Sequence, residues 1–204
     1  MKNENYHAYI LLTYTGSMLS SIIRRAGDMP YSHISIGFDE SHQTFYSFGR
    51  KYHSNPFFAG FVEEDVKNGV YQRFQEAQFA LYEIEVTKKQ YHELKRQIRT
   101  FERNKKLYRY NLLGMAFAKV GVSLSRNNAY FCSQFVATVF RRAGIHSFDR
   151  SDGLISPMDF LEIDGMRLLG QGRLSDFRLE QWGETRRHRR LREIPVSLFN
   201  RVFN

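Results

Sequence analysis

Residues 128–144, NAYFCSQFVATVFRRAG, hold the single cysteine of the chain, Cys132, at the point where a helix is predicted to begin. Apolar side chains at positions 135, 136, 139 and 140 recur at helical spacing, and Gly144 is a residue type that often ends a helix. The sequence therefore predicts a helix over 132–143 that buries one face and carries Cys132 in its first turn.

This position of Cys132 has two interpretations. Free N–H groups and the positive end of the helix dipole favour a thiolate over a thiol, and the same N–H groups could hold an oxyanion formed by attack on a carbonyl. A lone cysteine is, however, more often a small buried apolar residue. The choice between nucleophile and core residue therefore depends on the neighbours of Cys132.

Composition indicates one ordinary globular domain. The chain has 204 residues, of which 42% are hydrophobic and 25% charged. No apolar run approaches the roughly 20 residues that a membrane-spanning helix needs. Because one cysteine cannot form an internal disulfide and residues 1–20 do not resemble a signal peptide, we expect a reducing, cytoplasmic setting. The net charge of +9 favours anionic partners.

The patterning predicts an α+β fold with an antiparallel sheet packed against helices. Strands are expected at 7–15, 31–38, 44–49 and 79–87, and helices after Gly16, after the capping residue Thr87, at 112–120 and from Ser156. Residues 50–70 are expected to be irregular. We expect a single domain over 1–204, with a core at about 8–160 and an extension at 161–204 that includes the basic tail 186–192.

His33 is the histidine best placed to work with Cys132. Of the seven histidines, it alone is central to a predicted strand, and Ser35 and Gly37 on its face leave room beside the imidazole. Its functional interpretation is a general base that takes the thiol proton and returns it to the leaving group. The alternative is a half-exposed strand histidine without a chemical role.

The motifs SHISI around His33 and YFCSQFV around Cys132, in this order, resemble the circularly permuted papain-like cysteine hydrolases of the NlpC type. This is the broad group of the lecithin:retinol acyltransferase-like proteins, and the resemblance covers about residues 8–160. It implies that the cysteine helix packs against the sheet and that His33 projects toward the sulfur. It also implies cleavage of an amide or ester through an acyl-enzyme.

The resemblance further implies a polar residue, on the strand after the histidine, that orients the imidazole. The segment TFYSFG lacks the carboxylate, amide or histidine that is common in relatives, so Ser47 and Tyr46 are the candidates, and strand register decides between them. Tyr130, Ser133 and Ser35 are predicted to line the oxyanion or substrate region. Packing is the alternative role of Tyr130.

Other patterns are assigned ordinary structural roles. The adjacent acids Glu63, Glu64 and Asp65 are interpreted as a solvated loop, and the aromatic residues of 51–61 as a substrate wall, a lid or a covering loop. No spacing predicts a metal site, and Gly170 and Gly172 lack the context of a dinucleotide site, so no cofactor is expected.

Two classes of function remain. The first is a cysteine-dependent hydrolase or acyltransferase that acts on a peptide, an isopeptide or a lipid. The second is a non-enzymatic binding module whose basic surfaces hold nucleic acid or an anionic membrane. Those surfaces would be the helix at 88–106 and the tail cations Arg186, Arg187, Arg189 and Arg190.

Overall fold

The computed structural model describes residues 5–14, 30–39, 43–52, 55–66 and 77–176, with only the backbone described at 51–52 and 55–58. The helix predicted after Gly16 and the basic tail 186–192 lie outside the described residues. Within them, no helix combines the length and apolar character needed to cross a bilayer.

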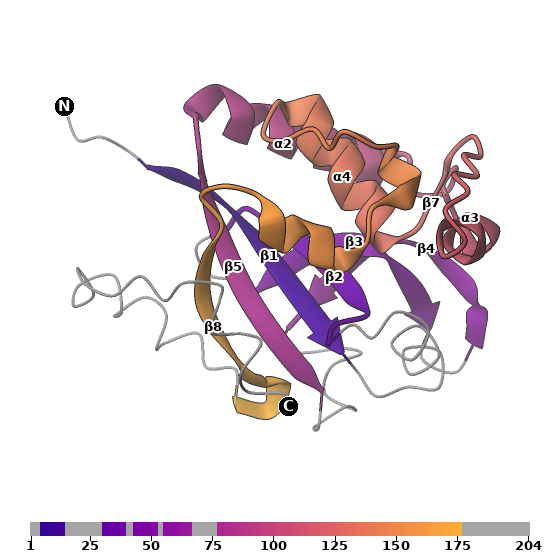
Figure 1. The fold of residues 1–204 in the computed structure, drawn as a ribbon, viewed down its shortest axis with the longest axis horizontal. Coiled ribbons are helices and arrows are strands. Elements are labelled where there is room, and N and C mark those ends of the chain that lie inside the picture. The colour runs from indigo at the N-terminus through magenta and orange to yellow at the C-terminus, as the bar shows by residue number, and fades with distance from the viewer. Residues whose placement is uncertain (1–4, 15–29, 40–42, 53–54, 67–76, 177–204) are drawn as a thin grey trace.

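The described chain forms strands and helices of an α+β fold, which confirms the predicted class (Figure 1). The strands are β1 (Tyr6–Tyr14), β2 (His33–Gly37), β3 (Thr44–Tyr52), β4 (Asn55–Asp65), β5 (Gln78–Val86), β6 (Arg109–Tyr110), β7 (Ala129–Tyr130) and β8 (Arg167–Arg173). The helices are α2 (Lys88–Arg103), α3 (Leu112–Ala118) and α4 (Cys132–Ala143), with short 3₁₀ helices η2 (Asp152–Leu154), η3 (Pro157–Glu162) and η4 (Leu174–Asp176).

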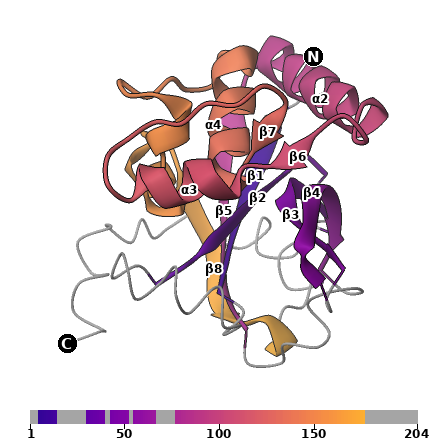
Figure 2. The same cartoon turned by 90° about the vertical axis from the view of Figure 1, so that its right-hand side faces the viewer.

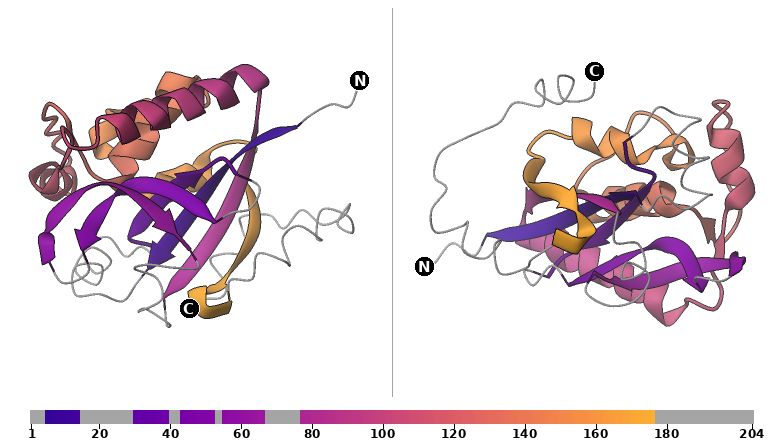
Figure 3. Two further views of the ribbon diagram at one scale, coloured as in Figure 1. Left: turned by 180° about the vertical axis from the view of Figure 1, so that it is seen from behind. Right: turned by 90° about the horizontal axis from the view of Figure 1, so that it is seen from below.

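Six strands form one antiparallel sheet in the order β4-β3-β2-β1-β5-β8. Its sixth strand, β8, comes from the expected extension after residue 160 and pairs with β5. Strands β6 and β7 form a separate parallel pair. Helices α2 and α4 lie together over one face of the sheet, as the views from the front and from behind both show (Figures 1 and 3).

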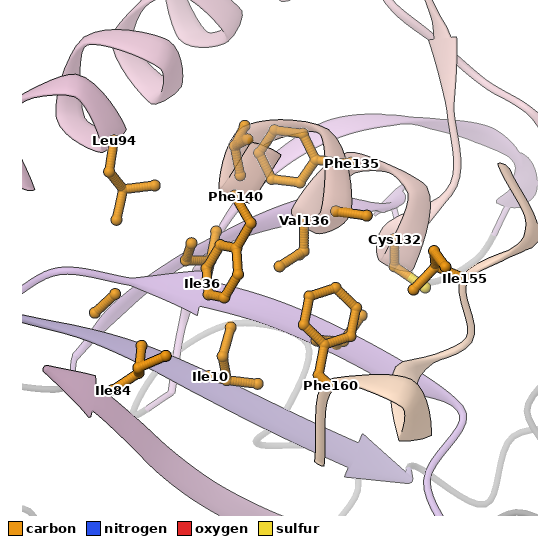
Figure 4. Packing of buried hydrophobic residues seen from close by; sticks show 14 of the residues in the cluster. Ile10, Ile36, Ile84, Leu94, Cys132, Phe135, Val136, Phe140, Ile155 and Phe160 are labelled. Carbon is orange, nitrogen blue, oxygen red and sulfur yellow. The ribbon is translucent and has the colours of Figure 1, made fainter. Parts of the chain in front are cut away.

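The helices form where local signals predict them. Thr87 caps α2 through a reciprocal capping box with Gln90, and α4 spans the predicted 132–143 and ends at Gly144 in the left-handed conformation. The apolar face of α4 meets the sheet in the main core, where Phe140 lies beside Ile36 and Val136 points toward the sheet (Figure 4). This packing fixes α4 over β2 and β3.

The described residues within 50–70 differ from the prediction of an irregular segment. They contain the end of β3 and the whole of β4, and these two strands pair antiparallel. The supposed solvated loop that includes Glu63 and Glu64 is therefore the end of a strand. The prediction was wrong because the stabilising contacts, such as the Phe48–Phe61 ring pair, lie between strands and leave no local alternation.

The β3–β4 arm separates from the sheet near His33. Ile36 and Tyr46 are the paired residues of β2 and β3, and farther along the Ser47 hydroxyl donates to the Ile34 carbonyl at 2.7 Å. At this position the Ser47 side chain, and not a backbone N–H group, connects β3 to β2. Seen from the side, β3 and β4 stand apart from β1, β2 and β5 (Figure 2). His33 lies at the end of β2 where this separation occurs.

Candidate active site

Cys132 is the first residue of α4, as predicted, and its side chain is 5% exposed. The close-up shows it in the first turn, beside Ile155 (Figure 4). The preceding residue, Phe131, has an extended backbone and supplies no side-chain cap, whereas Thr87 caps α2 and Asn111 caps α3. The first-turn N–H groups of α4 therefore lack the usual side-chain acceptor and can serve a bound anion.

The structure brings His33 to Cys132. His33 is the first residue of β2 and pairs with Thr13 at the end of the β1–β2 ladder. The imidazole lies close enough to the Cys132 side chain for that side chain to raise the pKa of His33. The second contact of the ring is made by Nε2, which lies 2.8 Å from Glu64 Oε1. Since Nε2 faces the carboxylate, Nδ1 is the nitrogen left for the sulfur.

Glu64 reaches His33 across the intervening strand β3. It lies on β4 and pairs with Phe45, so the side chain must pass over β3 to meet β2. Gly49 makes this contact feasible. A Cβ atom built on Gly49 would lie 3.6 Å from His33 Cε1 and 3.7 Å from Glu64 Oε1. The missing side chain leaves the space in which the imidazole and the carboxylate meet.

Gly49→Val is expected to disturb this contact, because branches beyond Cβ must enter the space between His33 and Glu64. We expect Cys132 reactivity toward a thiol probe at neutral pH to fall about threefold to tenfold. Gly49→Ala is the matched control, since its Cβ makes only ordinary van der Waals contacts. Equal probe rates for the wild type and Gly49→Val would contradict the assignment of this space.

The site is both shielded and charged. The side chains of His33 and Glu64 are 22% and 14% exposed. Burial lowers the pKa of His33, but the negative charge of Glu64 outweighs this effect. Together with the interactions with Cys132 and the hydrogen bond to Glu64, it raises the pKa to about 10. The imidazole is therefore protonated at neutral pH, and its positive charge lies beside the sulfur.

The two residues predicted to orient the imidazole have other roles. Ser47 donates its hydroxyl to the Ile34 carbonyl, and Tyr46 stacks between Phe38 and Phe61. The group on Nε2 is Glu64, from the strand after the predicted one. Sequence reasoning missed it because β4 was taken for a loop.

The residues predicted to line the oxyanion or substrate region each pack or hydrogen-bond elsewhere, or are buried without a partner in the described part of the chain. The Tyr130 ring packs against Phe48 and Phe101, with ring centroids 5.3 Å away from its own in both cases. The Ser133 hydroxyl donates to the Ile155 carbonyl at 2.6 Å. Ser35 is fully buried, and its hydroxyl has no hydrogen-bond partner within the described part of the chain.

Tyr110 is a further residue near the thiol that sequence reasoning missed. Burial raises the pKa of its hydroxyl, and the negative charge of Cys132 raises it further. The hydroxyl thus keeps its proton at neutral pH. It donates to Met115 Sδ at 3.4 Å, a weak acceptor that a stronger one can replace. No sequence signal separated Tyr110 from the other tyrosines.

Among the described residues, no group of three or more His, Cys, Asp and Glu side chains is placed to hold a metal ion. Comparison of the sequence with models of known protein families found no match, and no similar protein was found among the curated proteins. The functional argument therefore depends on the residues of the site.

Proposed function

We propose that the protein is a cysteine-dependent hydrolase or acyltransferase, with Cys132 as nucleophile, His33 as proton carrier and Glu64 as the residue that orients the imidazole. The observation that carries this proposal is the chain of contacts from the sulfur through His33 to a carboxylate. Nucleophile, base and orienting group in hydrogen-bonding reach are the requirements of nucleophilic catalysis.

The groups of the site account for each step on an ester or amide. The Cys132 sulfur bonds to the carbonyl carbon, and the carbonyl electron pair moves to oxygen, which the free N–H groups of the α4 first turn stabilise. The protonated His33 then gives its proton to the departing alcohol or amine, and a thioester remains. Water or an amine attacks the thioester while His33 accepts its proton, which releases the acyl product and Cys132.

We further propose that the core is a permuted papain-like arrangement of the NlpC type. The chain order supports it, because the histidine strand precedes the cysteine helix by about a hundred residues and α4 packs on an antiparallel sheet. The alternative, a binding module that uses basic surfaces, depends on the helix at 88–106 and on residues 186–192. The tail lies outside the described residues, and no observation on the helix favours this alternative over the Cys132 site.

The first test is the rate at which a carbonyl-directed thiol probe labels Cys132 between about pH 6 and 9. In the wild type we expect labelling to persist at pH 6, since the positive charge of protonated His33 lies beside the sulfur. In His33→Ala, Cys132 should be labelled at least about tenfold more slowly at pH 6, because the positive charge that stabilises the attacking sulfur is removed. His92→Ala, an exposed histidine on α2, is the control.

One result would contradict the proposal directly. If the native wild type does not react with the probe and Cys132 is labelled only after unfolding, the cysteine is a core residue. Equal rates for the wild type and His33→Ala would remove His33 from the mechanism.

A further inference from the structure

Helix α3 and the turns beside it carry an exposed apolar surface, which we call the α3 patch. It consists of Leu107, Leu112, Leu113, Phe117, Val120 and Val122, and each of these side chains is between 45% and 73% exposed. Scattered apolar residues are ordinary on protein surfaces, but six large ones within sixteen residues mark an interaction site. Helix α3 lies at one end of the molecule, away from α2 and the sheet (Figures 1 and 3).

Polar contacts, not the leucines, hold α3 in place. Its buried residue is Gly114, whose N–H donates to Asn111 Oδ1 at 3.0 Å. Asn111 Nδ2 donates in turn to the Leu124 carbonyl at 2.9 Å. The buried side of the helix thus has no room for a larger side chain, since a Cβ at position 114 would lie 2.1 Å from Asn111 Nδ2. The apolar side chains of α3 remain available for another surface.

The charged residues of the segment that carries the patch have one sign. Residues 104–128 contain no aspartate or glutamate and five cations, which are Lys105, Lys106, Arg109, Lys119 and Arg126. All five are exposed. Exposed apolar side chains among exposed cations are the composition of a surface that enters the headgroup region of an anionic bilayer.

We propose that the α3 patch docks the protein on an anionic lipid membrane. Leu113 and Phe117 enter the boundary between headgroups and acyl chains, and Lys105 and Lys119 contact lipid phosphates. A second copy of this chain fits less well on the same surface, because a symmetric contact would bring two sets of these cations together without a carboxylate from either segment.

Docking at this surface would place lipid near Cys132. Tyr110 lies two residues before α3 and pairs with Tyr130 of β7, which lies two residues before Cys132. A pocket of about 400 Å³ between these elements is lined in part by Arg109, Tyr110, Arg126 and Asn128. A lipid ester is therefore the substrate class that we favour over a peptide. This last step rests on the proposed function, whereas the docking itself does not.

The test is co-sedimentation of the full chain with vesicles of phosphatidylcholine and phosphatidylglycerol. We expect wild-type binding that weakens with salt and is much weaker on pure phosphatidylcholine. Leu113→Gln with Phe117→Gln, and separately Lys105→Gln with Lys119→Gln, should each reduce partitioning about tenfold or more. The matched controls are Leu168→Gln on β8, and Lys88→Gln with Lys89→Gln on α2, which are exposed positions outside the patch.

A second measurement reports contact with the bilayer directly. The fluorescence of Phe117→Trp, in a chain whose Trp182 is replaced by phenylalanine, should be quenched by brominated lipids in the same vesicles. The proposal is overturned if the wild type does not bind, if patch variants bind as the wild type does, or if the fluorescence of Phe117→Trp is not quenched. It is also overturned if only neutralising Arg186, Arg187, Arg189 and Arg190 abolishes binding.

A second copy of the chain is the competing occupant of the patch, and the state of the protein in solution decides between the two. A wild-type dimer that Leu113→Gln with Phe117→Gln converts to a monomer would assign the patch to a second copy and overturn membrane docking. Because sedimentation does not require catalysis, vesicle binding by Cys132→Ala equal to that of the wild type would support docking independently of the proposed chemistry.

Discussion

Cys132→Ala is expected to abolish acylation of the protein by an activated ester such as p-nitrophenyl acetate. The wild type should release a burst of p-nitrophenol and gain the mass of one acetyl group, because the thioester forms before it is hydrolysed. Without the sulfur no acyl-enzyme can form, and the burst rate should fall by about 10⁴-fold or more. Stopped-flow absorbance and intact-protein mass spectrometry measure the two effects.

Val139→Ala is the control for a general loss of structure. Val139 is fully buried on the same helix, two turns beyond Cys132, and its truncation removes core packing at a cost of about 2 kcal/mol. This variant should keep the burst at temperatures where it is folded. A burst that survives in Cys132→Ala would mean that another nucleophile acts, and the proposed role of the cysteine would fail.

The elements that the sequence predicts best are those whose signals are local. Thr87 and Gln90 are three residues apart and form the capping box that begins α2, and Gly144 ends α4 by its own backbone conformation. Cys132 in the first turn follows from the same short-range pattern. His33 on a strand follows from alternation over five residues.

The β3–β4 arm could not be predicted in the same way. Aromatic and polar residues follow one another in 50–61 without alternation, and the strand exists because Phe48 pairs with Phe61 and Gly49 with Gly60. These pairs depend on register between segments, which a single sequence does not reveal. The error at β4 then concealed Glu64, because a carboxylate in a solvated loop has no defined partner.

The signal that could have found Glu64 is the glycine at position 49. A glycine inside a strand has no side chain to pack and often marks a close approach of other groups. In this fold the groups that approach include His33 and Glu64, beside Val62. The same reasoning applies to α3, where Gly114 marks the contact with Asn111 and leaves the leucines on the solvent side.

Glu64→Gln is expected to lower the acylation rate by about 10²-fold or more, with the protein still folded. Glutamine retains the size of glutamate but not its charge, so it neither favours the imidazolium nor fixes the ring as firmly. The burst assay measures the change. Glu63→Gln is a close control, since Glu63 is an exposed neighbour that pairs with Tyr46 and points away from His33.

The same variant should change how stability depends on pH. The pKa of His33 is about 10 in the folded protein, against an ordinary value of 6.5. Because the folded state holds this proton more tightly, the stabilisation is fully present below about pH 6.5 and is lost as the pH rises through about 10. The loss is on the order of 2 kcal/mol, since His33 is partly exposed and solvent screens its charge.

Denaturant unfolding of the wild type and Glu64→Gln, measured across this pH window, isolates the contribution of the pair. Lysines and tyrosines also titrate near pH 10, but they are common to both proteins, so the difference between the two curves reports on His33 and Glu64. We expect the two stabilities to differ most at about pH 6.5 and just below it, and to converge above pH 10. Parallel curves would show that the Glu64 charge does not hold the His33 proton, and the orienting role of Glu64 would then be wrong.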